Sequence, residues 1–333
     1  MAGNYSRRQF LGYASATIGT SLLLKACNTS DSTDQSSEAS NKFKVAMVLP
    51  GIITDKAWNQ SGYNGLKVIE EKQGAETAYI EQVGQADQVE SLSDFARRGY
   101  DLIFAHGGQF DAAIEEVAAD FPDTFFVGVN GAIEGDNYAS LLINSLQAGY
   151  LCGVIAALAS KTNQIAYISA QKFASTQQEL EGLEMGAKSI NPEIKVRSTF
   201  TGDWNDAAKA KEATLALIST GADVIYQWLD NASPAVLQTA SEQGVYAFGN
   251  TTDQLNVAPD AVLTSAVKRI DLAIAYLADL KTKNELKGQV YKLGFEQDDI
   301  LYLGEFGKNV PEEVKQKAME TKQAIVEDEI KLT

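Results

Sequence analysis

The strongest constraint on the fold is an alternation of short, unbroken apolar segments with longer amphipathic ones. In the first part of the chain the apolar segments cover 43–50, 76–83, 102–105 and 124–129, and the amphipathic ones cover 58–72, 89–98 and 109–120. Apolar runs of this length are typical of strands buried on both faces, and the segments between them have helical periodicity. The pattern therefore predicts an α/β lobe in which helices cover both faces of a parallel sheet.

The same alternation begins again after 138–145, which we interpret as an extended crossing. Predicted helices cover 148–161, 176–190, 206–220 and 232–243, and predicted strands cover 164–169, 195–201, 224–227 and 246–249. Asp206 is a candidate N-cap of the third of these helices, and Gly221 follows its last turn. No short tandem period accompanies the alternation, so the chain is predicted to form two doubly wound lobes rather than a solenoid.

Residues 261–333 are too few for a third lobe and are predicted to complete the first two. They comprise an extended segment at 262–265, a helix at 269–283, a hairpin-like stretch at 289–303 and a terminal helix at 311–328. We assign 42–143 and 250–282 to an N-terminal lobe, and 144–249 and 283–333 to a C-terminal lobe. The chain then crosses between the lobes more than once, which predicts a multi-strand hinge with a ligand site in the cleft outside the carboxyl ends of the strands.

The first 41 residues have the features of an export signal and a tether. Arg7 and Arg8 precede an uncharged run, 12–24, that is shorter than the about 20 apolar residues a membrane-spanning helix needs. We interpret 1–26 as a twin-arginine-type signal peptide, Cys27 as the lipidated residue and 28–41 as a flexible linker. The protein is thus expected to be exported and anchored to the cell membrane by a lipid such as palmitate, facing the periplasm or the exterior.

Other interpretations of this segment stay open. Lys25 departs from the usual lipobox, and a plain cleaved signal, the general secretory route or a retained N-terminal anchor would also fit.

Composition restricts the partners. The formal net charge is −16, and it becomes −19 once 1–26 is removed, because that segment carries three basic residues and no acidic one. Such a surface repels nucleic acid and anionic lipid headgroups, so we expect neither as a partner of the globular part. Apart from Cys27 the chain has one cysteine, Cys152, and it has one histidine, His106. We therefore expect no disulfide, metal or cofactor, and a monomer is the default because one chain completes the cleft.

Candidate ligand-binding residues follow the predicted strands. Trp58 lies in the loop after the first strand and Trp228 follows a strand of the second lobe, so the two indoles are predicted to sandwich a flat ligand. Polar or aromatic neighbours at the strand ends would supply discrimination: Asn59, Gln109, Phe110, Asp230 and Asn231. Residues of these loops also have alternative roles. Trp58 can pack under its own helix, Asp55 can be an N-cap, and His106 can be a hydrogen-bonded wall residue rather than a base.

Five segments resemble the basic membrane protein family. They are Asp55-Lys56-Ala57-Trp58-Asn59-Gln60-Ser61-Gly62-Tyr63-Asn64-Gly65, Thr201 to Ala213, Gly221 to Ile225, Val245 to Gly249 and Ala258 to Ser265, and the likeness extends over 42–330. The resemblance implies a solute-binding lipoprotein of an ABC importer with the type I periplasmic-binding fold. Characterised relatives commonly bind purine nucleosides.

The resemblance also implies site residues, from which this chain departs. Family members tend to have Phe where this chain has Trp58, and Asp, which holds ribose hydroxyls, where it has Asn130 and Thr251. Asn130 and Asp253 remain able to bind hydroxyls. Trp228-Leu229-Asp230 replaces the small residues often found there, which implies a tighter pocket for a free base or another compact flat molecule. Lys268 matches a recurrent family lysine near the cleft, with a structural or surface lysine as its alternative.

We expect a binding protein rather than an enzyme. It would capture a small planar nitrogenous solute, a purine nucleoside or nucleobase above others, and deliver it to an ABC permease in the membrane. An exported hydrolase, with Asp55 or Asp230 as base and His106 assisting, is the competing class, although the chain has no Gly-x-Ser-x-Gly elbow. A ligand sensor, or a receptor for a vitamin or sugar, shares the same features.

Overall fold

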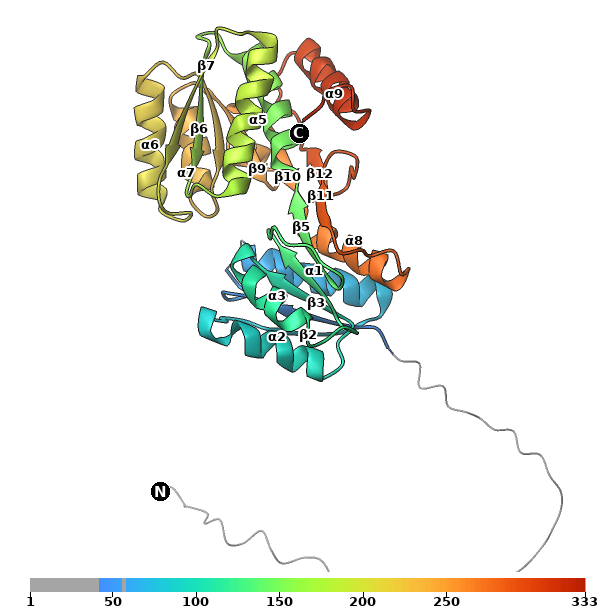
Figure 1. The fold of residues 1–333 in the computed structure, drawn as a ribbon. Coiled ribbons are helices and arrows are strands. Elements are labelled where there is room, and N and C mark those ends of the chain that lie inside the picture. Colours follow the sequence, from blue (N-terminus) through green and yellow to red (C-terminus); the bar gives the residue numbers. More distant parts are fainter. Residues whose placement is uncertain (1–41, 56–57, 333) are drawn as a thin grey trace, which may run out of the picture. The chain divides into compact units, whose positions relative to one another are not determined.

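The computed structural model describes residues 42–55 and 58–332 (Figure 1). The predicted signal peptide, Cys27 and the linker lie outside the described residues. The described strands form two six-stranded sheets with helices on both faces of each, so the predicted class of two doubly wound α/β lobes is confirmed.

The sheet of the first lobe is parallel throughout and has the strand order β11-β5-β4-β3-β1-β2. Its strands are β1 (Lys44–Val48), β2 (Glu76–Ile80), β3 (Leu102–His106), β4 (Phe125–Val129), β5 (Tyr138–Ile143) and β11 (Val290–Leu293). Helices α1 (Trp58–Gln73) and α8 (Ile270–Thr282) pack against each other on one face, and α2 (Gln88–Arg97) and α3 (Asp111–Ala118) pack on the other. Side chains of β1 alternate between the two faces, as a strand with period two requires.

The second sheet has the order β12-β10-β9-β8-β6-β7, and it is parallel except for β12, which runs antiparallel to β10. Its strands are β6 (Gln164–Ser169), β7 (Lys195–Phe200), β8 (Val224–Trp228), β9 (Tyr246–Thr251), β10 (Val262–Lys268) and β12 (Leu301–Leu303). Helices α4 (Ser145–Ala159), α5 (Ala174–Ile190) and α9 (Glu312–Val326) cover one face, and α6 (Ala207–Ser219) and α7 (Ser233–Glu242) cover the other (Figure 1).

Helix α6 shows why the predicted boundaries held where capping signals were strong. Asp206 accepts hydrogen bonds from the backbone N–H groups of Ala208 and Lys209, at 3.1 and 3.0 Å. Gly221 follows the last turn with a φ of +98°, a conformation that suits glycine because it has no Cβ. Both ends of the helix were therefore predicted from residues that satisfy the free groups of a helix terminus.

Pairing of the C-terminal strands corrects the predicted lobe boundaries. The segment 289–303 is not a hairpin, because β11 pairs with β5 in the first sheet and β12 pairs with β10 in the second. Likewise β10, which we had placed in the N-terminal lobe with 250–282, pairs with β9 of the C-terminal sheet. The extended crossing expected at 138–145 is strand β5, an inner strand of the first sheet.

Within the described residues the chain passes between the two sheets three times. The passages are at Asn144, at Arg269 and at 294–300. Hydrogen bonds join them, since the backbone N–H of Asn144 donates to the Leu293 carbonyl at 2.7 Å and that of Arg269 donates to the Ile300 carbonyl at 2.8 Å. The predicted multi-strand connection between the lobes is therefore present.

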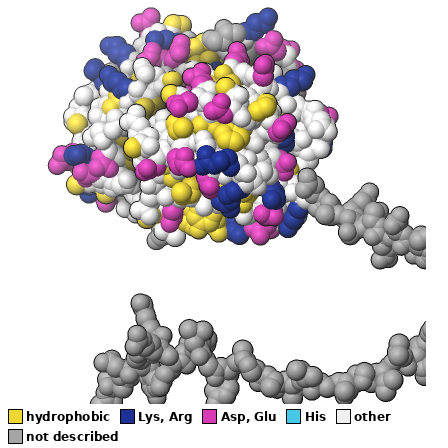
Figure 2. Space-filling model, turned by 60° about the horizontal axis from the view of Figure 1, so that its bottom comes forward, with side chains coloured by type: hydrophobic (Ala, Val, Ile, Leu, Met, Phe, Trp, Pro, Cys, Tyr) yellow, Lys and Arg dark blue, Asp and Glu magenta, His cyan; other side chains and the backbone are white. Residues whose placement is uncertain are grey.

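The surface and the helices of the described part add two observations. Acidic and basic side chains are interspersed on the face drawn in Figure 2. None of the described helices combines the length and apolarity that crossing a bilayer requires.

Candidate ligand-binding site

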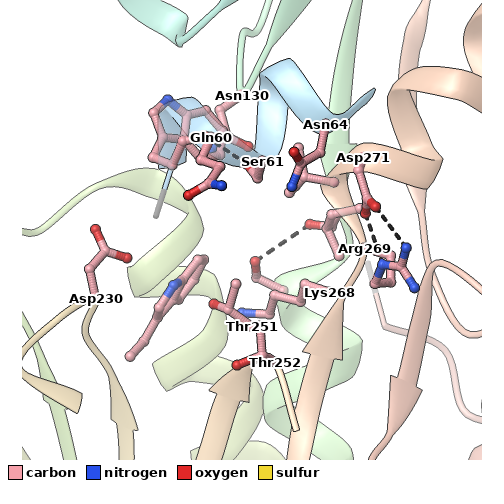
Figure 3. Close-up of a pocket in the computed structure, with 15 residues that line it drawn as sticks. Gln60, Ser61, Asn64, Asn130, Asp230, Thr251, Thr252, Lys268, Arg269 and Asp271 are labelled. Atoms are coloured by element: carbon pink, nitrogen blue, oxygen red, sulfur yellow. Dashed lines mark hydrogen bonds and ion pairs between the residues drawn. The ribbon is translucent and has the colours of Figure 1, made fainter. Parts of the chain in front are cut away.

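A pocket of about 370 Å³ lies where the carboxyl ends of strands from both sheets meet. Its lining comes from both lobes: residues of α1 and the end of β4 on one side, and the ends of β8, β9 and β10 on the other. Figure 3 shows the labelled polar side chains on the two sides of the pocket. This is the cleft position predicted for an open parallel sheet.

Trp58 starts α1 and lines the pocket. The Asp55 carboxylate accepts hydrogen bonds from the backbone N–H groups of Asn59 and Gln60 at 2.9 and 3.0 Å, so Asp55 caps the helix as its alternative role predicted. The indole stacks on the His106 ring, with centroids 4.0 Å apart and planes 21° apart, and its Nε1–H donates to the His106 carbonyl at 3.3 Å. One face of Trp58 is thus held by the protein.

His106 supports the indole from the interior. Its ring is fully buried, and its Nε2 lies 2.8 Å from the Trp58 carbonyl, to which it donates as the neutral tautomer with hydrogen on Nε2. Burial lowers the pKa of His106 to about 4, so the ring is neutral at physiological pH. A Cβ at Gly62 would lie 2.8 Å from this ring, which explains the glycine in α1. Of its two predicted roles, these contacts support that of a hydrogen-bonded wall residue rather than that of a base.

Trp228 enters the pocket from the end of β8, above a buried charge pair. The Lys268 ammonium lies 3.3 Å from the centroid of the indole, and it donates to both Glu179 oxygens at 2.8 and 2.9 Å. Asn250 also donates to Glu179 at 3.0 Å, and the Tyr226 hydroxyl donates to it as well. Of the roles predicted for Lys268, the ion pair with Glu179 supports the structural one, although the side chain also borders the pocket.

Burial at this charge pair shifts the pKa values of Lys268 and Cys152. Burial lowers the pKa of Lys268 from its ordinary value, and the Glu179 carboxylate opposes that shift. Burial also raises the pKa of Cys152 to about 12. Cys152 is therefore a buried thiol rather than a reactive one.

Asp230 lies two residues beyond Trp228 and lines the same pocket, whereas Leu229 between them is buried in the core against α7. Burial raises the pKa of Asp230 to about 6, and the negative charge of Asp55 adds to that shift. Among the described residues no group donates a hydrogen bond to the Asp230 carboxylate and no cation pairs with it.

Two backbone positions at equivalent places in the lobes are held in the left-handed region. Asn130 follows β4 with a φ of +60°, and Thr251 ends β9 with a φ of +69°; both line the pocket. Asparagine tolerates this conformation, but a β-branched threonine rarely adopts it. Such strain is concentrated at functional sites, where the surroundings enforce it.

The far end of the pocket carries an ion pair. Arg269 Nε and Nη2 donate to the two Asp271 oxygens at 2.9 and 2.7 Å. Figure 3 shows this pair on the side of the pocket opposite Asp230.

Five of the ten predicted ligand residues line the pocket, and five do not. The lining residues are Trp58, Asn130, Trp228, Asp230 and Lys268. The residues elsewhere are Asn59, Gln109, Phe110, Asn231 and Asp253.

Those five have other surroundings. Asn59 bonds Asp55 and the Gly51 backbone, and Asn231 donates to the Asn205 side chain at 2.8 Å. Asp253 accepts from the backbone N–H of Glu305 at 2.9 Å and from Ser265, so it holds neighbouring loops together. Phe110 is fully buried in the core between β3 and α3, and Gln109 is exposed outside the pocket. The positions of these residues do not support a ligand role for them.

The pocket also contains polar residues that were not among the predicted ligands. Gln60, Ser61 and Asn64 lie on one face of α1 with Trp58, and their helical spacing was a usable signal. Ser145, Thr252 and Arg269 come from the passages between lobes or from a loop, where sequence spacing says little about position.

Among the described residues, no group of three or more His, Cys, Asp or Glu side chains is placed to hold a metal ion.

Comparison with known proteins places the chain in a family. The sequence model of the Bmp family, described as ABC transporter substrate-binding protein PnrA-like, matches residues 42–333. The chain is 32% identical to the transcriptional activator protein med of Bacillus subtilis over 277 residues, which are 82% of this chain and 86% of that protein. It is also 32% identical to a purine-binding protein of Brucella abortus over 302 residues, which are 88% of this chain and 83% of that protein.

A solved structure agrees with these relatives. The structure of a transcriptional activator of the comK gene from Bacillus halodurans matches with a TM-score of 0.76 and 28% identity, over 85% of this chain and 97% of that one. The two parallel-sheet lobes have the arrangement of type I periplasmic-binding proteins. The chain belongs to the Bmp family of PnrA-like ABC transporter substrate-binding proteins.

Proposed function

We propose that this protein captures a purine nucleoside or free nucleobase between Trp58 and Trp228 and delivers it to an ABC permease. The single observation that carries the proposal is that one indole from each lobe lines the same pocket. A flat heterocycle can stack between two such rings whichever base it carries. A pocket of about 370 Å³ lies within the range of small-molecule sites.

The polar lining supports a nitrogenous ligand. Gln60, Asn64 and Asn130 each offer an amide that can both donate and accept, as ring nitrogens and exocyclic groups require. The relative from Brucella abortus that is named purine-binding supports the same class of ligand.

Asn130, directly after β4, and Thr251, at the end of β9, bear on whether the ligand carries ribose. Asn130 and Thr251 present an amide and a hydroxyl to the pocket, and neither is a carboxylate that would accept from two ribose hydroxyls at once. We therefore include the free base within the proposed ligand class.

Delivery requires the protein to be outside the cytoplasm, where substrate-binding proteins of ABC transporters work. We propose export through the signal at 1–26, lipidation at Cys27 and action as a monomer. The three passages between lobes form the hinge about which the ligand favours closure, because it contacts both lobes at once.

Alanine substitution at each indole tests the sandwich. Calorimetric titration with guanosine, adenosine and the corresponding free bases should show binding to the wild-type protein. Trp58→Ala and Trp228→Ala should each weaken it by about tenfold to a hundredfold, since a lost stacking face costs about 1–3 kcal/mol.

Tyr79→Ala is the control, because Tyr79 is an exposed aromatic side chain of β2 that does not line the pocket. Circular dichroism of all three variants checks that the fold persists. Unchanged affinity in both pocket variants would refute the sandwich. Thiamine, flavin and glucose belong in the same titration as rival solutes, and release of free base from a nucleoside would argue for a hydrolase instead.

A further inference from the structure

One of the charged groups that line the pocket has no partner of opposite charge. Both cations are already paired within the protein: Lys268 with Glu179, and Arg269 with Asp271. Asp230 is the remaining ionisable group of the lining, and no cation among the described residues pairs with it. With Asp230 ionised and Glu179 counted beside its partner Lys268, these described groups carry one unit of net negative charge, and the unpaired carboxylate lies at the end of the pocket opposite Arg269 (Figure 3).

The Asp230 carboxylate also has unused hydrogen-bonding capacity. A carboxylate accepts at two oxygens, and a partly buried one that accepts nothing from the protein is unfavourable. Its backbone position is held, because its N–H donates to the Trp204 carbonyl at 3.1 Å and its carbonyl accepts from Ser233 at 3.0 Å. Trp228 and Asp230 therefore present a stacking surface and an unpaired double acceptor, carried on a held backbone, to the same ligand.

We propose that Asp230 is the specificity-determining residue of the cleft, and that it accepts two N–H hydrogen bonds from the edge of a stacked heterocycle. The selected solutes carry a ring N–H beside an exocyclic amine, as guanine does, or a cationic ring with the same edge. This inference rests on the proposed function, since it assumes a flat ligand between the indoles.

An unpaired carboxylate at this position would distinguish between solutes in two ways. An adenine edge presents a ring nitrogen lone pair beside its amine, so one carboxylate oxygen would face another acceptor and lose its hydrogen bond. A phosphorylated solute would bring negative charge into a pocket in which Lys268 and Arg269 are both already paired with carboxylates, so no free cation of the lining would offset it. Nucleotides are therefore expected to bind more weakly than nucleosides, and guanine compounds are preferred.

Matched ligands and a charge-matched control make the test specific. Guanosine, inosine, adenosine and guanosine monophosphate are titrated into the wild type, Asp230→Asn and Glu212→Gln. Glu212 is exposed on α6 outside the pocket, so its substitution removes one negative charge without touching the site. Wild type should bind guanosine about tenfold to a hundredfold more tightly than adenosine, because hydrogen bonds to a charged acceptor are strong.

Inosine, which keeps the ring N–H and lacks the amine, should fall between them, and the monophosphate should bind weakest. Asp230→Asn should lose most of the preference for guanosine over adenosine, whereas Glu212→Gln should keep it. A preference that survives in Asp230→Asn, or a wild type that favours adenosine, would overturn the role of Asp230 and leave the indole sandwich intact. If none of these compounds binds the wild type, the proposed function fails, and this inference fails with it.

Discussion

At the scale of single residues, the Asp230 carboxylate is unfavourable without a ligand but can accept hydrogen bonds from one that binds. Its pKa is raised to about 6 because burial removes water from the carboxylate and the negative charge of Asp55 disfavours a second ionised group. Lys268 and Arg269, the cations of the lining, are bound to their own carboxylates. A ligand that donates two N–H groups would replace the missing water and stabilise the ionised form.

The affinity should therefore depend on pH in a defined direction. Below about pH 6 the Asp230 carboxyl of the unliganded protein is protonated, and a ligand that needs the ionised form must first displace that proton. Guanosine affinity should fall by close to tenfold for each pH unit below about 6 and level off above it. Titrations between pH 4.5 and 8 measure this slope.

Asp230→Asn should give a flat profile over the same range, and Glu212→Gln should follow the wild type. A wild-type affinity that is constant across this range would show that the ligand does not depend on the charge of Asp230.

The site was predictable from sequence where a residue directly follows a strand. Trp228 ends β8 and Asp230 lies two residues beyond it, so both stand at the carboxyl end of the strand, where the pocket lies. Asn59 lies between the lining residues Trp58 and Gln60, yet the Asp55 cap engages it. A 3₁₀ turn after β3 directs Phe110 into the core. Local loop conformation decided these cases, and it leaves no periodic signal.

At the scale of secondary structure elements, four glycines set the distance between α4 and α5. A Cβ at Gly149 or Gly153 would lie 2.0–2.3 Å from backbone oxygens of α5, and a Cβ at Gly182 or Gly186 would lie 2.0–2.2 Å from those of α4. The helices therefore meet backbone to backbone. This close approach brings Glu179, on α5, to the Lys268 ammonium beneath Trp228.

Adding a methyl group at this contact should destabilise the protein. Gly149→Ala must push α5 away from α4, and overpacking of this kind typically costs about 1–3 kcal/mol. Thermal and urea unfolding measure the loss. The same shift would move Glu179, so ligand affinity should fall as well.

Gly84→Ala is the control, since its added Cβ would meet nothing closer than 4.0 Å and its φ of −75° suits alanine. Equal stabilities of the two variants would mean that the helices can separate without cost.

The elements themselves were largely predictable, and their partners at the C-terminus were not. Inner strands such as β3 and β4 are unbroken apolar runs, which buried parallel strands require. The pair β11 and β12 has the spacing of a hairpin, but the intervening residues 294–300 cross between lobes. Which sheet a short strand joins depends on the free edge available to it, and that is a property of the assembled fold.

At the scale of the whole described molecule, a single apolar cluster extends through both lobes. It contains Met47 and Ile274 of the first lobe and Leu151 and Tyr167 of the second. The three passages between sheets bond to one another beside it. The lobes therefore share interior contacts as well as a chain, and their stabilities are expected to be coupled.

Calorimetric unfolding tests that coupling together with ligand binding. The protein should unfold in one transition, because loss of either lobe exposes part of the shared cluster. Guanosine at a hundred times its dissociation constant should stabilise the native state by about 2.7 kcal/mol and shift the entire transition upward. Trp228→Ala, measured at the same ligand concentration, should shift less. Two transitions, of which the ligand moves one, would mean that the lobes unfold independently and that one lobe alone holds the ligand. Closure of the cleft could not then account for binding, because a ligand that favours closure must stabilise both lobes.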